Sequence, residues 1–240
     1  MVSEQVVDRF FEALTTGDRP AARKVVQELR GGSGGGSGKL SPERMISELF
    51  WPVYQQIDQL FRTDQLNCLN HHMAVRLLRV LVDQNAGQLQ ASASRGRSIF
   101  AVCGPQESEE LGAQMALDML EGAGFNVTFG GGGIANDEIL ARVNEYKPDV
   151  LLMFCSAAAD LPNIRVLIDT IREIGSAPEM QIAVGGGVFN RAEGLAEEIG
   201  ADTWATSPME IVETLVSDPS RRAVATQRTV GRTRRKRDAA

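Results

Sequence analysis

The chain has 240 residues, of which 43% are hydrophobic and 23% are charged, and these values are typical of a globular protein. They exclude a collagen-like, a mucin-like and a wholly disordered chain. The formal net charge is −6, but eight basic residues lie from Arg221 onward against Asp238 alone, so the residues before them are strongly acidic. An acidic body disfavours a broad nucleic-acid-binding surface, because phosphate binding rests on Lys and Arg.

The N-terminal part of the chain predicts four helices. Apolar residues recur at helical spacing over residues 6–14 and again over residues 20–29. Ser41 followed by Pro42 is a typical start of a third helix. A fourth helix is expected over residues 66–82, with Leu69, Met73 and Leu77 facing inward. Four amphipathic helices with short connections indicate a four-helix bundle over residues 1–87.

Two segments of different composition interrupt or follow this bundle. Residues 31–38 read GGSGGGSG, a flexible composition that cannot bury apolar surface. We interpret them as an engineered linker that replaces a natural loop, and we give them no functional role. Residues 88–97 lose the helical periodicity and become small and polar, which is typical of a linker between domains.

Beyond residue 97, short apolar runs alternate with helical segments. Strands are predicted at residues 99–103, 126–129, 150–155, 181–184 and 203–205, and helices at residues 109–122, 137–144, 162–173, 191–199 and 209–217. This alternation indicates an α/β domain over residues 98–218, built on a doubly wound five-stranded parallel sheet. Residues 219–240 are expected to form a basic, disordered tail, which could touch nucleic acid or an acidic protein.

The loops after the predicted strands are unusually small. They contain Gly104, Gly130, Ser156 and the run Gly185–Gly187. Ligands of such sheets bind at the carboxyl ends of the strands, and glycine lets them approach the backbone. The loops together predict a broad, shallow platform for a large flat ligand. There is no G-x-G-x-x-G motif after the first strand and no Walker lysine, which disfavours a dinucleotide or a nucleoside triphosphate.

The cysteines and the hydropathy bear on the cellular compartment. Cys68, Cys103 and Cys155 form no C-x-x-C pair, so we expect a reducing compartment and no disulfide framework. The N-terminus lacks the apolar core of a signal peptide, and no run approaches the roughly 18 apolar residues of a membrane span. The sequence therefore predicts a cytoplasmic protein without membrane contact; a homo-oligomer is compatible with it.

Several segments occur in the order found in a known family. They are E-S-E-E-L-G at residues 107–112 in place of D/E-x-H-x-x-G, Met119–Leu120, Gly124–Phe125, Lys147–Val150, Ser156, Gly185–Gly186 and Gly200–Asp202. The chain thereby resembles the cobalamin-binding family in its two-part form, a helical cap followed by a flavodoxin-like B12-binding domain. Residues 57–61 and His71–His72 occupy the place of the W-x9-E-H segment of light-sensing members. The resemblance is closest to that sensory branch of adenosylcobalamin photoreceptors and photocobilins.

The departures from the family pattern affect the expected site. Glu109 stands where the family places the histidine that ligates cobalt from below, and a carboxylate is a hard anionic ligand unlike neutral imidazole. Binding through that histidine is therefore unavailable here. Phe61 replaces the tryptophan, His71 the glutamate before the cap histidine, and Ala158 a leucine. We expect the pocket for the nucleotide tail of the corrinoid to be altered or shut.

The helical part keeps residues suited to a tetrapyrrole. Cys68, His71 and His72 are spaced so that Cys68 shares a helical face with either histidine. Imidazole can ligate the metal of a corrin or haem, with His72 the candidate upper cobalt ligand, or hydrogen-bond a linear bilin. Alternatively, Cys68 is a core residue and His71 is solvated. The predicted cofactor-binding residues are Phe61, Cys68, His71, His72, Glu107, Ser108, Glu109, Gly112, Gly130, Ser156, Gly185, Gly186, Gly187 and Phe189.

Three functions follow from these features. The first is a sensory module that binds cobalamin (adenosylcobalamin), a linear bilin such as biliverdin, or both, and signals to a partner by rearrangement of the cap. The second is a corrinoid carrier for a methyltransferase, against which Glu109 argues. The third is a degenerate binding domain kept as a protein-interaction module. No enzyme activity is expected, because no nucleophile has a matching His/Asp pair and no catalytic residue is predicted.

Overall fold

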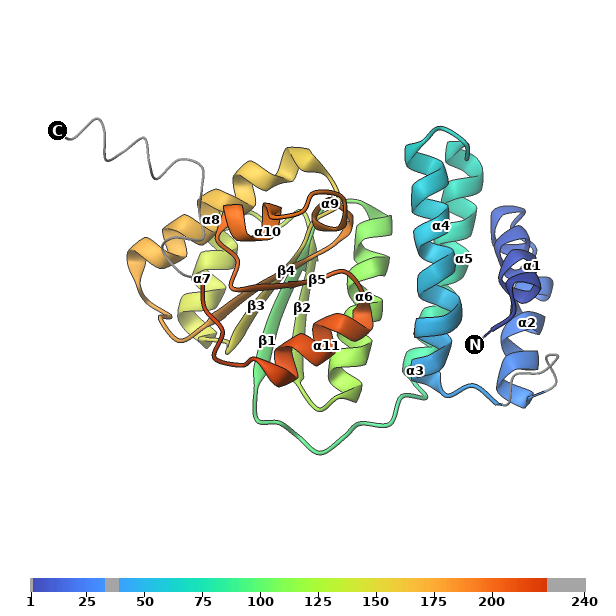
Figure 1. Ribbon diagram of the computed structural model, residues 1–240, viewed down its shortest axis with the longest axis horizontal. Helices are drawn as coiled ribbons and strands as arrows, with labels where there is room; N and C mark the ends of the chain where they lie inside the picture. Colours follow the sequence, from blue (N-terminus) through green and yellow to red (C-terminus); the bar gives the residue numbers. More distant parts are fainter. Residues whose placement is uncertain (1, 33–38, 224–240) are drawn as a thin grey trace. The chain divides into compact units, whose positions relative to one another are not determined.

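The computed structural model describes residues 2–32 and 39–223, and the chain divides into two compact units (Figure 1). The first unit is Met1–Gln90 and the second is Ala91–Ala240. The boundary falls inside the segment 88–97 that the composition indicates as a linker. Of the residues predicted to form the artificial Gly/Ser linker, 33–38 lie outside the described ranges.

The described residues of the first unit form helices and the turns that connect them. They are α1 (Glu4–Thr15), α2 (Arg19–Gly31), α3 (Pro42–Met45), a π-helical segment Ile46–Phe50, α4 (Trp51–Arg62) and α5 (Cys68–Ala86). The side chain of Asp18 caps α2 and that of Ser41 caps α3, accepting from Ala21 N at 3.0 Å and Arg44 N at 3.3 Å. α1 packs against α2 and α5. The first three predicted helices are therefore present, the third running through α3, the π-helical segment and α4.

The first turn of α5 differs from the prediction, whereas Leu77 is buried as expected. Leu69, expected to face inward, is 68% exposed, whereas His71 is buried. The helix begins at Cys68 with Asn67 as its N-cap, and the His71 ring stacks on Phe61 at 3.8 Å between centroids. Because His71 takes the inward position of the first turn, Leu69 is turned to solvent.

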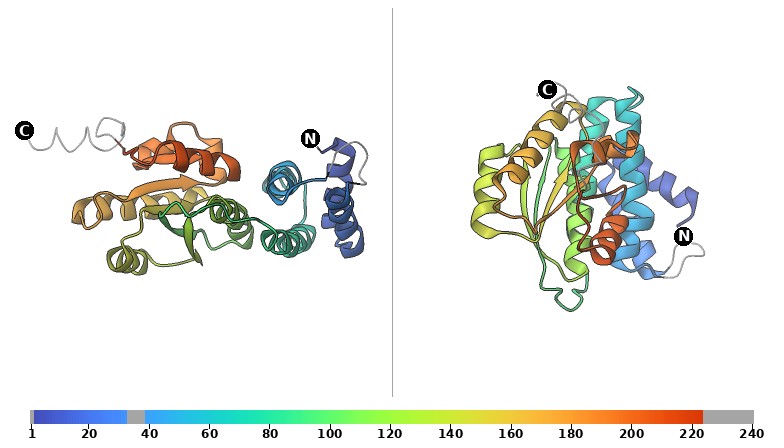
Figure 2. Two further views of the ribbon diagram at one scale, coloured as in Figure 1. Left: turned by 90° about the horizontal axis from the view of Figure 1, so that it is seen from below. Right: turned by 60° about the vertical axis from the view of Figure 1, so that its left-hand side comes forward.

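The second unit is a parallel sheet between two layers of helices (Figures 1 and 2). The strands are β1 (Ser98–Cys103), β2 (Asn126–Gly132), β3 (Val150–Phe154), β4 (Gln181–Gly185) and β5 (Thr203–Ala205), in the order β2-β1-β3-β4-β5. The helices are α6 (Glu107–Gly122), α7 (Asn136–Tyr146), α8 (Leu161–Ile174), α9 (Gly187–Arg191), α10 (Leu195–Ile199) and α11 (Pro208–Ser217). The predicted five-stranded, doubly wound parallel sheet is confirmed.

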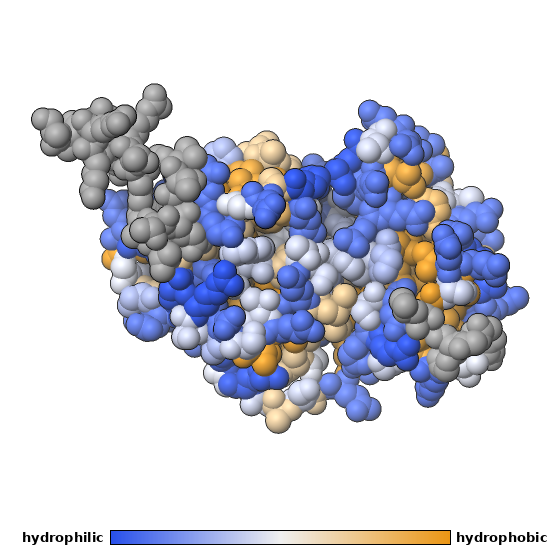
Figure 3. Space-filling model, viewed as in Figure 1, coloured by the Kyte–Doolittle hydropathy of each residue, from blue (hydrophilic) through white to orange (hydrophobic). Residues whose placement is uncertain are grey.

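Two cores hold the sheet and helices together. Alternate strand residues point to opposite faces, so Val102 and Met153 pack with α7 and α8, whereas Ala101 and Leu152 pack with α6 and α11. Most apolar side chains of the second unit are packed in these two cores. The visible surface is accordingly largely hydrophilic, with small apolar patches (Figure 3). Within residues 2–32 and 39–223, no helix is both long and apolar enough to traverse a lipid bilayer.

Two predicted elements differ from the structure. β2 extends to Gly132, so Gly130 lies inside a strand and not in a loop; a side chain there would meet Ile134 at 2.8 Å. The helix predicted over residues 191–199 begins only at Leu195 as α10, whereas residues 187–191 form the separate short helix α9. Between the two helices Ala192 is extended, with φ −132°, and Gly194, the N-cap of α10, has φ +78°.

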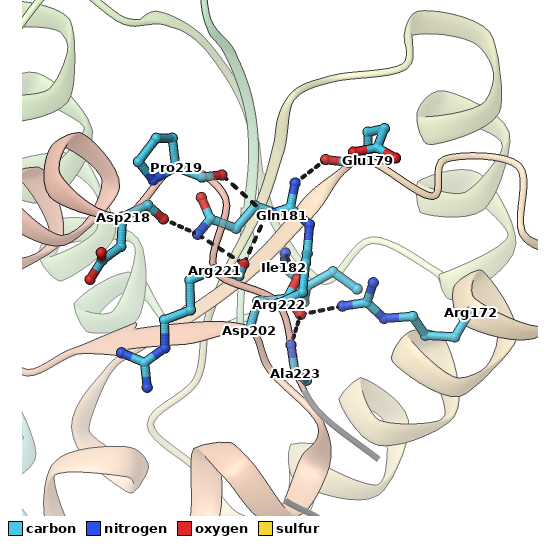
Figure 4. A network of polar contacts seen from close by, with 10 residues as sticks. All are labelled: Arg172, Glu179, Gln181, Ile182, Asp202, Asp218, Pro219, Arg221, Arg222 and Ala223. Atoms are coloured by element: carbon cyan, nitrogen blue, oxygen red, sulfur yellow. Dashed lines mark hydrogen bonds and ion pairs between the residues drawn. The ribbon is translucent and has the colours of Figure 1, made fainter.

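The segment after α11 is ordered up to Ala223 and lies at the amino-terminal edge of the sheet (Figure 4). One oxygen of the buried Asp202 carboxylate accepts hydrogen bonds from Arg172 and from the N–H of Ala223, each at 2.6 Å. The other oxygen accepts from Ile182 N at 2.6 Å. Asp202 thus ties this segment to α8 and β4.

Gln181 adds a second anchor at the same edge. Its buried side-chain amide donates to the carbonyl oxygen of Asp218 at 2.9 Å (Figure 4). Its amide oxygen accepts from Arg97 at 3.1 Å. The prediction of a disordered tail from residue 219 is therefore wrong for residues 219–223, because two buried polar side chains satisfy their hydrogen bonds with this backbone. Residues 224–240 of the predicted tail lie outside the described ranges.

Candidate functional site

The candidate site is the carboxyl edge of the sheet, where the strand order places β1 beside β3. The chain leaves β1 toward β2 on one side and leaves β3 toward β4 on the other. The loops that follow β1 and β3 therefore diverge, and such a switch point is where open α/β sheets bind ligands. The predicted residues Ser108, Glu109 and Ser156 all lie in or directly after these loops.

Glu109 joins the two loops. Its side chain is buried, and its carboxylate accepts hydrogen bonds from Ser156 N at 2.6 Å and Gln106 N at 3.3 Å. A Cβ on Gly104 would lie 2.2 Å from a carboxylate oxygen of Glu109, so only glycine fits beside it. The Glu109 carboxylate is consequently a hydrogen-bond acceptor within the domain, bonded to backbone N–H groups of the loops that follow β1 and β3.

Ser156 is also tied to the loop after β4. Arg191 donates to its carbonyl oxygen at 2.6 Å, and Gly187 N donates to its hydroxyl at 3.4 Å. A Cβ on Gly187 would lie 2.5 Å from the guanidinium of Arg191. Glu109 and Arg191 therefore use both backbone hydrogen-bonding groups of Ser156 inside the protein.

The loops after β3 and β4 also touch through their backbones. Gly186 has φ +107°, and a Cβ there would lie 2.4 Å from the carbonyl oxygen of Cys155. The thiol of Cys155 is buried at 3.1 Å from the carbonyl oxygen of Ala157. Burial, together with the negative charges of Asp160 and Glu109, raises the pKa of Cys155 to about 12. Cys155 is therefore held as a neutral thiol at physiological pH.

The acidic first turn of α6 disfavours an anionic ligand at this helix. α6 begins with Glu107, Glu109 and Glu110 in its first turn. Helix N-termini stabilise negative charge, and here three carboxylates already use that position. A phosphate at this helix would meet like charge, in agreement with the absence of a phosphate-binding motif.

Several predicted site residues lie away from the open edge. Gly112 is buried inside α6, Gly185 is the last, buried residue of β4, and Gly130 lies within β2. Phe189 is buried in the core cluster on the α7 and α8 face. Glu107 is exposed and Ser108 half-buried at the start of α6. The structure brings together Glu109, Ser156 and Gly187, but it does not place Gly112 or Phe189 with them.

In the helical unit the predicted residues form two pairs. Phe61 and His71 stack with their planes 14° apart, and Cys68 Sγ lies 3.7 Å from His72 Nε2. Cys68 and His72 are exposed and His71 is buried. This is the reverse of the alternative in which Cys68 belongs to the core and His71 is solvated.

Arg191 was not predicted as a site residue from the sequence. It is the last residue of α9, whereas the prediction made it the first residue of the following helix, and its contact with Ser156 joins residues 35 positions apart. A faint signal existed, because Arg191 is the first charged side chain after the glycines that follow β4.

The chain is thus a protein of two units, a helical one and an α/β one. The sheet of the α/β unit has a switch point between β1 and β3, the place where such sheets bind ligands. Residues 97–213 match the family described as "B12 binding domain", and residues 6–84 match a second family with the same description. Together the matches span most of both units. The chain belongs to the B12-binding domain family.

Known relatives are named as corrinoid proteins. The chain is 22% identical over 214 residues to "Dimethylamine corrinoid protein 1" of Methanosarcina acetivorans, covering 88% of this chain and 96% of that protein. It is 21% identical over 214 residues to "Dimethylamine corrinoid protein" of Methanosarcina barkeri, again covering 88% of this chain and 96% of that protein.

A solved structure shares the fold. The monomethylamine corrinoid protein of Methanosarcina barkeri aligns with a TM-score of 0.68 at 15% identity, covering 89% of this chain and 98% of that chain. The resemblance to the cobalamin-binding family is thus confirmed. The narrower placement among photoreceptors is not supported, because these relatives are named as corrinoid proteins, and nothing in them points to a bilin.

Proposed function

We propose that this protein is a corrinoid carrier, which holds a corrinoid at the carboxyl edge of its sheet and presents it to a separate methyltransferase. The observation that carries the proposal is the extent of the similarity to Dimethylamine corrinoid protein 1, which covers 88% of this chain and 96% of that protein and so spans both units. Sequence reasoning favoured light sensing and kept the carrier as the alternative; the relatives reverse that order. A carrier of this kind catalyses no reaction alone.

The edge of the sheet fits the periphery of a corrin. Corrin rings carry amide side chains that need hydrogen-bond partners, and Gln106, Ser108 and Asn190 supply neutral polar groups there. Gly186 lets a ring approach the backbone closely because it carries no Cβ. These residues would hold and orient the ring.

The α/β unit supplies no histidine that could bind the cobalt of a corrinoid. The chain has two histidines, His71 and His72, and both lie in the helical unit. Glu109 is engaged with Ser156 N and Gln106 N. A bound corrinoid supplies a cobalt that carries a methyl group. The α/β unit would hold such a corrinoid through its edge and its amides, without a protein nitrogen on the metal.

Reconstitution tests this proposal. The chain is incubated in the dark with hydroxocobalamin or methylcobalamin, and unbound corrinoid is removed by gel filtration. We expect about one corrinoid per chain by absorbance. Absence of retained corrinoid would overturn the proposal, and a light-dependent spectrum with a bilin would restore the sensory interpretation.

Isotope labelling tests the ligation. Co(II) electron paramagnetic resonance is recorded for unlabelled and for uniformly ¹⁵N-labelled protein carrying the same corrinoid. We expect the nitrogen splitting to be identical in both, because the axial nitrogen comes from the corrinoid or is absent. A changed splitting would show that a protein nitrogen binds cobalt, with His72→Ala then identifying whether it is His72.

A second candidate function rests on the closed loops. Glu109 and Arg191 satisfy the backbone of Ser156 without a ligand, as expected for a binding domain that has become a protein-interaction module. A folded chain that retains no corrinoid would favour this candidate.

A further inference from the structure

The start of α5 carries an exposed thiol and an exposed imidazole that lie side by side. Cys68 is the first residue of the helix, His72 follows about one turn later, and both side chains are exposed. The sulfur of Cys68 lies 3.7 Å from Nε2 of His72. His71 does not share this surface, because it is buried and stacks on Phe61. Two metal-ligating groups are therefore accessible on one face of α5.

The separation of these two groups fits a tetrahedral zinc ion. Zinc binds a thiolate sulfur at about 2.3 Å and an imidazole nitrogen at about 2.0–2.1 Å. At a tetrahedral angle these bond lengths place the sulfur and the nitrogen about 3.6 Å apart. The 3.7 Å between Cys68 Sγ and His72 Nε2 is close to this value. The two side chains can therefore bind one zinc ion without a change in the helix.

One chain supplies only half of a closed zinc site. Structural zinc sites hold four protein ligands, and two cysteines with two histidines are one of their usual sets. Among residues 2–32 and 39–223, no group of three or more His, Cys, Asp or Glu side chains could hold a metal ion. Two further ligands must therefore come from another molecule.

The surroundings of Cys68 and His72 suit a second copy of the chain. Residues 65–75 contain no Asp, Glu, Lys or Arg, although 23% of the chain is charged. Two such surfaces can meet without like-charge repulsion from these residues. Leu69, which follows Cys68, is 68% exposed, and its burial between two copies would stabilise the contact.

We propose that Cys68 and His72 form half of a zinc site, and that two copies of the chain join through one zinc ion. The ion is bound by both Cys68 sulfurs and both His72 Nε2 atoms, and a two-fold axis through it makes the two halves equivalent. Each thiol gives its proton to water on binding, so the two thiolate charges neutralise the charge of the ion. This site requires no corrinoid and does not rest on the proposed carrier function.

Sedimentation velocity of the full chain, free of corrinoid and of any affinity tag, tests the proposal. The chain is reduced beforehand and kept anaerobic, so that no disulfide joins two Cys68 side chains. We expect a monomer without metal, a dimer with zinc that saturates at one ion per two chains, and a return to monomer with EDTA. An assembly state that zinc leaves unchanged, or saturation at one ion per chain without a dimer, would overturn the proposal.

Cobalt(II) in place of zinc reports the ligands directly. Tetrahedral cobalt with thiolate ligands absorbs strongly in the visible range and has a sulfur-to-metal charge-transfer band in the near ultraviolet. We expect both features when cobalt(II) is added to the metal-free chain. The weak visible absorption of six-coordinate aqueous cobalt alone would contradict the assigned ligands.

Substitutions identify the residues that bind the ion. Cys68→Ser and His72→Gln each remove two of the four ligands from the dimer, and each should weaken zinc-dependent dimerisation at least about tenfold. Both side chains are exposed, so neither change should disturb folding. The matched controls are Cys103→Ser, which removes another thiol, and Asp64→Asn, which removes the carboxylate that precedes α5 in the sequence; both should dimerise with zinc like the parent chain. Dimerisation that survives either Cys68→Ser or His72→Gln would refute the site.

Alkylation provides a second measurement. Zinc should protect Cys68 of the native chain from iodoacetamide, as read by mass spectrometry, and His72→Gln should abolish the protection. Equal alkylation with and without zinc would show that the contact between Cys68 and His72 is a thiol–imidazole hydrogen bond alone, and the proposal would fail.

Discussion

The carboxylate of Glu109 accepts a hydrogen bond of 2.6 Å from the backbone N–H of Ser156, and this contact joins the loops after β1 and β3. In a parallel sheet these two loops diverge at the switch point, and here the Glu109 side chain connects them. We therefore expect Glu109, which the resemblance places at the family's histidine position, to contribute here to the stability of the domain.

Removal of this bridge should destabilise the α/β unit. Glu109→Ala leaves the N–H groups of Ser156 and Gln106 without their acceptor, which costs about 1–3 kcal/mol for each group that water does not reach. Glu109→Gln retains one acceptor oxygen and should cost less. Urea unfolding measures both.

The matched control is Glu121→Ala on the exposed side of the same helix, with an expected change of about 0.5 kcal/mol or less. If Glu109→Ala changes the free energy of unfolding by no more than this control does, the contact between Glu109 and Ser156 contributes nothing to stability.

Asp202 should be among the most sensitive positions. Asp202→Ala leaves the N–H groups of Ile182 and Ala223 unsatisfied, and we expect a loss of about 3 kcal/mol in the free energy of unfolding. Arg172→Ala removes only the partly exposed ion pair and should cost about 1 kcal/mol. Equal losses in the two variants would show that the ion pair, and not the backbone contacts, carries the effect. Chemical denaturation of both variants provides the comparison.

Gly124 should tolerate no side chain. Its φ is +92°, and a Cβ would lie 2.3 Å from the carbonyl oxygen of Ala93. We expect Gly124→Ala to cost about 1–3 kcal/mol, from backbone strain and the displaced segment. Gly87→Ala is the control, because a Cβ there meets nothing within 4 Å and its φ of −62° suits alanine. In thermal unfolding, Gly124→Ala should lower the melting temperature more than Gly87→Ala does. An equal change in both variants would contradict the close contact between Gly124 and Ala93.

The cysteines should differ in reactivity. The pKa of Cys155 is raised from 9.0 to about 12, so its nucleophilic thiolate is scarce at pH 8, and the thiol is buried. We expect iodoacetamide at pH 8 to alkylate the exposed Cys68 and to spare Cys155 until urea is added, as read by mass spectrometry. Rapid alkylation of Cys155 in the native chain would refute its buried placement.

The same shift predicts how stability depends on pH. The folded state favours the protonated thiol, and the unfolded state loses that proton near pH 9. The contribution of Cys155 is therefore complete below pH 9 and falls as the pH rises toward about 12. Cys155→Ala should remove this fall in the free energy of unfolding between pH 9 and pH 11. Cys68→Ala should leave the fall unchanged.

The periodic features were predictable from the sequence. The five strands, their parallel arrangement and the helical N-terminal unit follow from apolar runs, from amphipathic spacing and from the start signals at Ser41 and Pro42. These features depend on neighbours within a few residues, which a single sequence displays. The inward position of Leu69 was wrong, although Leu77 further along α5 is buried as predicted, because Leu69 and His71 both suit the first turn of a helix and the structure stacks His71 on Phe61.

The contacts between distant segments were not predictable. The sequence shows that Glu109 replaces a histidine, but not that its carboxylate reaches Ser156, 47 residues away. The order at residues 219–223 was missed for the same reason, since Asp202 and Gln181 lie far from the basic stretch they anchor. The break between α9 and α10 contains the extended Ala192 and the positive φ of Gly194, which a helical pattern conceals.

The anchoring of Ala223 by Asp202 has a practical consequence for anyone who labels this protein. The described chain ends at the amino-terminal edge of the sheet, opposite the loops that follow the strands. A fluorophore on a cysteine introduced at Ala223 is therefore attached to the domain at the edge away from the proposed corrin platform. Immobilisation through this position should leave the platform accessible to ligand in surface-based binding measurements.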